Sequence, residues 1–213
     1  MPIRAALFDF DGTLADSFTA ITQSTNHVLR SFGRPELTVE EVRHYVGFGL
    51  PSLMQELLPG CDLELAVARY REHHPSVTHS GTKLLAGVAE TIPELARRGI
   101  VMAVCSNKMV HFTRDLVQHF GLAPYFQVVL GPDDVHNRAK PDPAMLLEAL
   151  ARLKIPSLDA VYVGDMAIDV RTAKAAGMPA WLVPGGASGH ESPLDAGPDL
   201  VLKNFQELLE RIP

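Results

Sequence analysis

The sequence predicts an α/β protein that consists of a parallel sheet covered by helices and a helical domain inserted after the first strand. Short apolar segments alternate with helical patterns over most of the 213 residues, as in sheets whose parallel strands are joined by helices. Residues 16–80 break this alternation, because they contain helical patterns only. A connection of that length is uncommon inside one domain, so we expect a second domain there.

Five apolar segments are predicted to form the strands. The first covers residues 3–10 and runs into acidic residues and a glycine, which predicts a strand that stops at a turn. The others cover residues 100–105, 127–130, 160–163 and 179–183. Helical patterns lie between them at residues 88–98, 112–120, 143–154 and 168–176. In a sheet of this kind, the functional site is expected beyond the carboxyl ends of the strands.

The inserted segment is predicted to contain helices only, over residues 17–32, 39–46, 51–58 and 63–74. We therefore expect two domains. Residues 1–15 and 81–213 form the sheet domain, and residues 16–80 form the small helical domain. The chain crosses between them twice, at residues 14–17 and 79–83, and these two crossings are the expected hinges.

Composition and charge argue against several classes of function. Hydrophobic residues make up 46% of the chain and charged residues 21%, as in ordinary globular proteins. The net charge of −6 disfavours nonspecific binding to nucleic acids, and no apolar run reaches the ~20 residues of a membrane helix. Cys61 and Cys105 cannot form a disulfide framework, and no apolar signal-peptide region precedes the first strand. We therefore expect a cytoplasmic protein that binds neither nucleic acid nor membranes.

Two pairs of aspartates follow predicted strands. Asp9 and Asp11 end the first strand in the motif DFDGTL, and the two-residue period of a strand puts them on the same side. Asp165 and Asp169 follow a later strand in the motif GDMAID. Simple helix capping accounts for Asp169 alone but less well for Asp165. If both strand ends face one crevice, four carboxylates converge there, and a hard divalent cation such as Mg²⁺ relieves their repulsion.

Two further polar motifs follow strands or lead into helices. Ser106 and Asn107 come directly after the strand at residues 100–105, where a hydroxyl and backbone N–H groups suit a phosphate, although a helix N-cap is the alternative interpretation. Lys140 lies in the motif AKPDP, whose prolines favour an extended segment that leads into a helix. Taken alone, this motif fits a surface lysine equally well.

The order of the four motifs resembles the haloacid-dehalogenase-like hydrolase superfamily over essentially the whole chain. DFDGTL is similar to the nucleophile motif of that superfamily, VCSNK to its Ser/Thr motif, AKPDP to its lysine motif and GDMAID to its terminal acidic motif. The resemblance implies a Rossmann-like parallel sheet core, with the inserted helices as an α-helical cap domain.

The resemblance also implies a role for each motif residue. Asp9 is implied to be the nucleophile that forms an aspartyl phosphate, and Asp11 the general acid and base. The implied cofactor is Mg²⁺, bound by the Asp9 carboxylate, the Asp11 backbone carbonyl and Asp165, with Asp169 orienting these ligands from behind. The residues implied to contact phosphate or substrate are Gly12, Thr13, Ser106, Asn107 and Lys140.

Within the superfamily, the residues favour a phosphatase. Asp11 is present, whereas the dehalogenases lack this second acid. Residues 16–80 contain no lysine for the Schiff base of phosphonoacetaldehyde hydrolases, and residues 18–22 lack the histidine of β-phosphoglucomutases. The segments DGTLADS and VGFGLP resemble phosphoglycolate-phosphatase-like enzymes, so 2-phosphoglycolate is the expected substrate. Pyrophosphate, sugar phosphates and nucleotides stay open, because relatives with this pattern also act on them.

Arg43 and His44 precede the VGFGLP turn, and we expect them to contact the substrate, with the guanidinium binding a carboxylate through two hydrogen bonds. A solvated helix face is an equally good interpretation of these two residues. The expected partner is a small phosphorylated metabolite, and the chain is expected to be a monomer or homodimer. The alternative from another class is a non-catalytic phospho-acceptor signalling module, although such modules lack a helical insertion.

Overall fold

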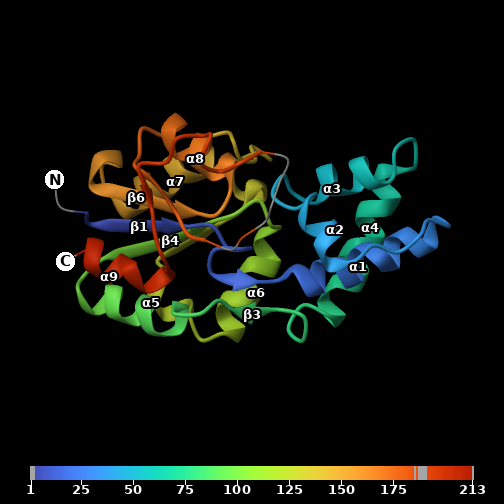
Figure 1. The fold of residues 1–213 in the computed structure, drawn as a ribbon, viewed down its shortest axis with the longest axis horizontal. Coiled ribbons are helices and arrows are strands. Elements are labelled where there is room, and N and C mark those ends of the chain that lie inside the picture. Colours follow the sequence, from blue (N-terminus) through green and yellow to red (C-terminus); the bar gives the residue numbers. More distant parts are fainter. Residues whose placement is uncertain (1–2, 185, 187–190, 213) are drawn as a thin grey trace.

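The computed structural model describes residues 3–184, 186 and 191–212, and its central feature is a six-stranded parallel sheet (Figure 1). The strands lie in the order β5-β4-β1-β6-β7-β8, and each neighbouring pair is parallel. The bounds are Ala5–Phe8 for β1, Val101–Cys105 for β4, Val128–Leu130 for β5, Ala160–Gly164 for β6, Ala180–Leu182 for β7 and Leu200–Val201 for β8. The predicted α/β class is confirmed.

The five predicted strand segments form β1, β4, β5, β6 and β7, but β8 was not predicted. It consists of only two residues, and its pairing with β7 rather than a local sequence pattern makes it a strand. The strand order runs in opposite directions on the two sides of β1, because β4 lies on one side and β6 on the other. Such a switch opens a crevice at the carboxyl end of the central strand.

Helices cover both faces of the sheet (Figure 1). On one face lie α5 (Val88–Arg97), α6 (Val110–His119) and α9 (Leu208–Arg211), and on the other lie α7 (Ala144–Leu153) and α8 (Ala167–Ala175). Strand β1 is therefore buried on both sides: Ala6 and Phe8 belong to the first apolar cluster, and Ala5 and Leu7 to the second. This explains why β1 is apolar throughout instead of alternating with polar residues.

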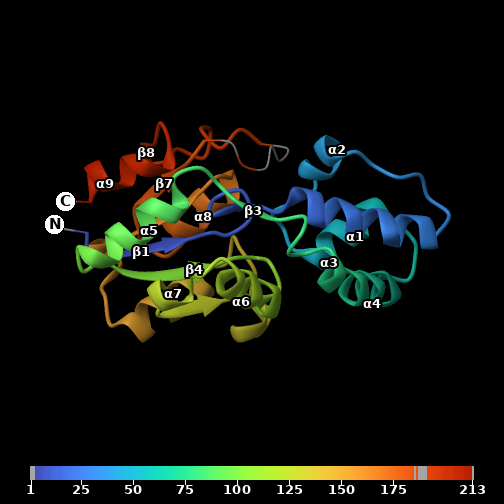
Figure 2. The ribbon, with the colours of Figure 1, turned by 90° about the horizontal axis from the view of Figure 1, so that it is seen from below.

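The inserted helices lie together beyond the carboxyl end of β1 (Figure 2). They are α1 (Phe18–Ser31), α2 (Val39–Arg43), α3 (Leu50–Leu57) and α4 (Leu63–His73). Short 3₁₀ turns occur at His74–Ser76, Ala123–Tyr125, Pro132–Asp134, Ser157–Asp159 and Phe205–Glu207. The apolar cluster of these inserted helices also contains Met166 and Ile168 from the sheet domain, so the two parts of the chain share apolar contacts.

The turn after α2 brings the inserted segment close to the sheet domain. The helix predicted at residues 39–46 ends at Arg43, and the chain then turns through Gly47 and Gly49, whose φ angles are 126° and 88°. Residues that carry a side chain rarely adopt such φ angles, so both positions favour glycine. A Cβ on Gly47 would lie 2.5 Å from the Met166 sulfur, which shows how closely the turn approaches the β6–α8 loop.

The two chain crossings lie side by side. Strand β2 (Ala15–Asp16) pairs antiparallel with β3 (Lys83–Leu84), and neither strand was predicted, because each has only two residues. The expected hinges at residues 14–17 and 79–83 overlap this ribbon, and their function as hinges stays a prediction. Among the helices in the described part of the chain, none is both long and apolar enough to cross a membrane.

The packing of β1 gives a first test of the fold. Phe8 is fully buried, and its ring centroid lies 6.1 Å from that of Phe126 and 5.8 Å from that of Phe205. We expect Phe8→Ala to lower the free energy of unfolding by about 3–5 kcal/mol, because the cavity it leaves cannot close completely. Urea denaturation measures this change.

The matched control for Phe8→Ala is Leu158→Ala, since the side chain of Leu158 is 59% exposed. This control should change the free energy of unfolding by no more than about 0.5 kcal/mol. Equal effects of the two substitutions would contradict the packing described for β1.

Candidate active site

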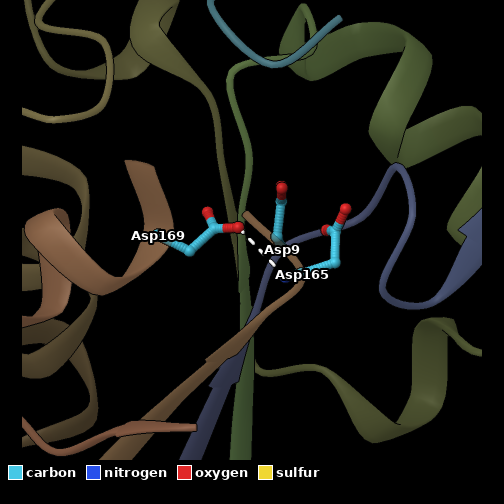
Figure 3. Close-up of side chains that lie close together, drawn as sticks. All are labelled: Asp9, Asp165 and Asp169. Atoms are coloured by element: carbon cyan, nitrogen blue, oxygen red, sulfur yellow. Dashed lines mark hydrogen bonds between the residues drawn. The ribbon is translucent and has the colours of Figure 1, made fainter. Parts of the chain in front are cut away.

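Three buried aspartates meet at the carboxyl edge of the sheet. Asp9 directly follows β1, Asp165 directly follows β6, and Asp169 lies in the first turn of α8 (Figure 3). One carboxylate oxygen from each lies within 4.8 Å of the other two. Because β1 and β6 are adjacent parallel strands, their carboxyl ends meet, which brings three of the four predicted carboxylates together.

The ammonium group of Lys140 lies between two of these carboxylates. Its Nζ is 2.7 Å from Asp9 Oδ2 and 2.6 Å from Asp169 Oδ1, and 3.4 Å from the Tyr162 hydroxyl. Burial by itself lowers the pKa of Lys140, but the neighbouring carboxylates of Asp169 and Asp9 outweigh burial, so the pKa is raised. Lys140 is therefore a buried, permanently charged cation that neutralises the acids around it.

Asp169 organises the loop that carries Asp165. Its Oδ2 accepts a hydrogen bond from the backbone N–H of Asp165 at 3.1 Å (Figure 3). The same oxygen accepts from the backbone N–H of Met166 at 3.0 Å. The approach is possible because residue 164 is a glycine: a Cβ there would lie 2.4 Å from Asp169 Cβ. Burial raises the pKa of Asp169, opposed by the Lys140 charge. With both oxygens engaged by donors of the protein, Asp169 is suited to orienting its neighbours.

Thr13 donates a hydrogen bond to Asp165, and Gly12 leaves room for the Asp165 carboxylate. The Thr13 hydroxyl is fully buried and donates to Asp165 Oδ1 at 2.8 Å. The Gly12 N–H donates to the Ala15 carbonyl at 2.8 Å, which closes the turn after β1. A Cβ on Gly12, at a φ of 86°, would lie 2.4 Å from Asp165 Oδ2. The Gly12 N–H and the Thr13 hydroxyl thus have partners within the protein, and their contact with substrate stays a prediction.

Asp11 is paired with a lysine that the sequence analysis did not assign to the site. Lys108 Nζ lies 3.2 Å from Asp11 Oδ1 and 3.3 Å from Oδ2, and the Ser17 hydroxyl also donates to Oδ1. The Lys108 side chain is only 5% exposed. Lys108 lies two residues after Ser106, just beyond a predicted strand. This position was the available sequence signal for an ion pair in the site, because a lysine at the acidic edge of the sheet has carboxylates within reach.

Asn107 joins three parts of the site through its side-chain amide. Its Oδ1 accepts from the Lys140 N–H at 2.7 Å, while Nδ2 donates to the Lys140 carbonyl at 3.3 Å and to the Gly47 carbonyl at 2.9 Å. The Asn107 amide thus fixes the backbone of Lys140 and binds the turn of the inserted segment at Gly47. Since the side chain is fully used in this way, only the backbone N–H of Asn107 is a candidate donor to an anion.

A cavity of about 60 Å³ opens next to Asp9, between the sheet domain and the inserted helices. Asp9, Asp11, Ser106 and Lys108 supply its polar wall. The opposite wall is formed by Tyr70 of α4, by His74, and by apolar side chains that include Leu50, Leu53 and Phe112. A cavity with one polar and one apolar wall is suited to a small ligand that has a charged end.

Arg43 and His44 are not among the described residues that line this cavity, and their contact with substrate stays a prediction. The Arg43 guanidinium is used elsewhere: Nη2 lies 3.2 Å from Asp16 Oδ2, and Cζ lies 4.0 Å above the Phe18 ring. It therefore ties α2 to the chain crossing at the start of α1. His44 is exposed.

Comparison with known proteins identifies the family. The family model described as "Haloacid dehalogenase-like hydrolase" matches residues 6–183, so the chain belongs to this family. It is 34% identical to "Phosphoglycolate phosphatase 1" of Pseudomonas aeruginosa, over 97% of this chain and 78% of that protein. It is 37% identical to "Phosphoglycolate phosphatase" of Rhodobacter capsulatus, over 91% of this chain and 89% of that protein.

The fold is shared with solved structures as well. The crystal structure of CbbY from Rhodobacter sphaeroides in complex with phosphate superposes with a TM-score of 0.83, at 28% identity, over 97% of this chain and 96% of that chain. The resemblance to this hydrolase family that the motifs indicated is confirmed.

The wall histidine of the cavity gives a test of its burial. His74 is 1% exposed, and its Nδ1 lies 2.9 Å from the Ser24 hydroxyl. Burial, followed by the positive charge of Lys108, lowers the pKa of His74 from 6.5 to about 2. Between these values the unfolded chain binds the proton and the folded chain does not, so stability is present above pH 6.5 and is lost as the pH falls.

We therefore expect the wild type to lose about 2 kcal/mol more unfolding free energy than His74→Gln between pH 7 and pH 5. Urea denaturation at the two pH values measures the difference. His136→Gln, a change at an exposed histidine, is the control and should keep the pH dependence of the wild type. If the unfolding free energy of His74→Gln depended on pH as in the wild type, His74 would not be buried in its neutral form.

Proposed function

We propose that this chain is a Mg²⁺-dependent phosphomonoester hydrolase that acts through an aspartyl phosphate on a small phosphorylated metabolite, with 2-phosphoglycolate as its substrate. The observation that carries the proposal is the position of Asp9. Its carboxylate is buried, lies 2.7 Å from the Lys140 ammonium and opens onto the cavity. Membership in a hydrolase family and the names of the relatives in Pseudomonas aeruginosa and Rhodobacter capsulatus support it.

The residues of the acidic edge fit a magnesium ion. Asp9, Asp165 and Asp169 offer oxygen ligands only, which is the donor chemistry that Mg²⁺ prefers. Asp169 is already engaged by Lys140 and two backbone N–H groups, so Asp9 and Asp165, with the Asp11 carbonyl, are the proposed ligands. Gly12 and Gly186 keep the space around the Asp165 carboxylate clear of side chains. When bound, the ion supplies positive charge that stabilises the transferring phosphoryl group.

In the first step, a carboxylate oxygen of Asp9 attacks phosphorus, and the bond from phosphorus to the ester oxygen breaks. The proton of the Asp11 carboxyl group goes to the departing alkoxide, which leaves as an alcohol. Lys140 offsets the negative charge of Asp9, so that the nucleophile can approach an anionic substrate. Ser106, which lines the cavity, and the backbone N–H of Asn107 are the proposed contacts of the phosphoryl oxygens.

In the second step, water attacks the phosphorus of the aspartyl phosphate, and Asp11, now a carboxylate, accepts the proton of that water. The bond from phosphorus to Asp9 breaks, which releases inorganic phosphate and restores the Asp9 carboxylate. The shared apolar cluster around Met166 and the Asn107–Gly47 hydrogen bond hold the inserted helices over the site. Closure of this kind keeps bulk water out during attack, and opening releases the product.

The nucleophile assignment is tested with Asp9→Asn. An amide is a poor nucleophile, so turnover of p-nitrophenyl phosphate and of 2-phosphoglycolate should fall at least about 10³-fold. Phosphate release measures both rates. Asp115→Asn is the control, because the Asp115 side chain is half exposed and pairs with His79 on the surface. Turnover near the wild-type rate in Asp9→Asn would refute the proposal. If the wild type formed a stable phospho-aspartate without turnover, a signalling module would be favoured instead.

Removal of the metal is a separate test. We expect an excess of EDTA to abolish turnover of p-nitrophenyl phosphate, because without the metal the charge of the phosphoryl group is no longer compensated. Added Mg²⁺ should restore turnover. The far-ultraviolet circular dichroism of the EDTA-treated protein serves as a control that the fold persists. Undiminished turnover in EDTA would contradict the assignment of the acidic edge as a metal site.

A further inference from the structure

We propose that Lys108 selects substrates with an anionic leaving group by exchanging one carboxylate for another. In this structure its ammonium holds Asp11; in the substrate complex it holds the carboxylate of the leaving group, and Asp11 is released toward the ester oxygen. The inference rests on the proposed phosphatase function and adds to it the residue that determines specificity.

The first observation is that Lys108 occupies the whole carboxylate of Asp11. Both oxygens lie within 3.3 Å of Nζ, and the Ser17 hydroxyl donates to one of them. The side chains of Lys108 and Asp11 are 5% and 12% exposed, so water screens this pair weakly. An acid that must deliver a proton to a leaving oxygen has to leave this contact first. The pair is therefore a resting arrangement that substrate binding has to change.

The second observation is the composition of the cavity. Among the described residues that line it, Lys108 is the only lysine or arginine. His74 is neutral at physiological pH, because burial lowers its pKa to about 2. The remaining wall beyond the acidic edge is largely apolar, with Leu50, Leu53 and Phe112. An anionic group that enters with the leaving group therefore finds its opposite charge at Lys108.

The exchange follows from the cost of isolated buried charges. A buried ammonium without an anion is strongly unfavourable, so Lys108 gives up Asp11 at little cost only when another anion takes its place. A carboxylate close to the ester oxygen satisfies this condition, and a neutral hydroxyl in the same position does not. The chemical class selected is thus a small phosphomonoester with a carboxylate next to the carbon that bears the phosphate.

A pair of substrates of nearly equal size tests the exchange. 2-Phosphoglycolate carries the carboxylate, and 2-hydroxyethyl phosphate carries a neutral hydroxyl instead. The quantity measured is the ratio of kcat/KM for the first substrate to kcat/KM for the second. We expect Lys108→Met to lower this ratio at least about 30-fold, because the buried charge that binds the carboxylate is lost. Lys108→Arg should keep most of the discrimination, since the charge remains.

Lys203→Met, at an exposed lysine, is the matched control and should leave the ratio unchanged. If Lys108→Met does not fold by circular dichroism, Lys108→Gln replaces it in the same measurement. An unchanged ratio in the neutral variants, with both substrates slowed equally, would overturn the exchange and leave Lys108 as a support for Asp11 only. Absence of turnover of either substrate by the wild type would refute the proposed function instead, so the two failures are distinguishable.

Discussion

The ammonium group of Lys140 lies between the carboxylates of Asp9 and Asp169, and the charge balance of the whole sheet edge depends on this contact. Three buried aspartates within 4.8 Å of one another would otherwise repel each other strongly. Lys140 places a positive charge beside the Asp9 carboxylate, and Asp169 binds the backbone of the loop that carries Asp165. One cation from the β5–α7 connection thus connects acids that follow two different strands.

The position of Lys140 is itself fixed by Asn107, and this amide links the acidic edge to the inserted helices. Asn107 holds the Lys140 backbone on one side and the Gly47 carbonyl on the other. Met166, which follows Asp165, packs into the apolar cluster of the inserted helices. The placement of the helices over the cavity is therefore coupled to residues directly beside the proposed nucleophile and metal ligands.

The chemistry and the choice of substrate are divided between different segments. In the proposed mechanism, the residues that handle the phosphoryl group follow strands of the sheet, where parallel pairing sets their spacing rigidly. The cavity that receives the rest of the substrate takes one wall from Tyr70, His74 and apolar residues of the inserted segment. Members of one family can in this way keep the acidic edge and vary the leaving group they accept.

The sequence by itself determined the fold class and the positions of Asp9, Ser106, Lys140 and Asp165 near one edge. This was possible because strand ends are marked locally, by apolar runs that stop at acids and glycines, and parallel pairing then brings those ends together. Only the tertiary structure decided which partner each side chain has. Arg43 binds Asp16, Thr13 holds Asp165, and Lys108 holds Asp11. The last two pairs join residues about 100 or more positions apart, and for Arg43 the direction of the side chain after α2 depends on how the helix packs. No local pattern encodes such partners, because they depend on distances and burial that exist only once the chain is folded.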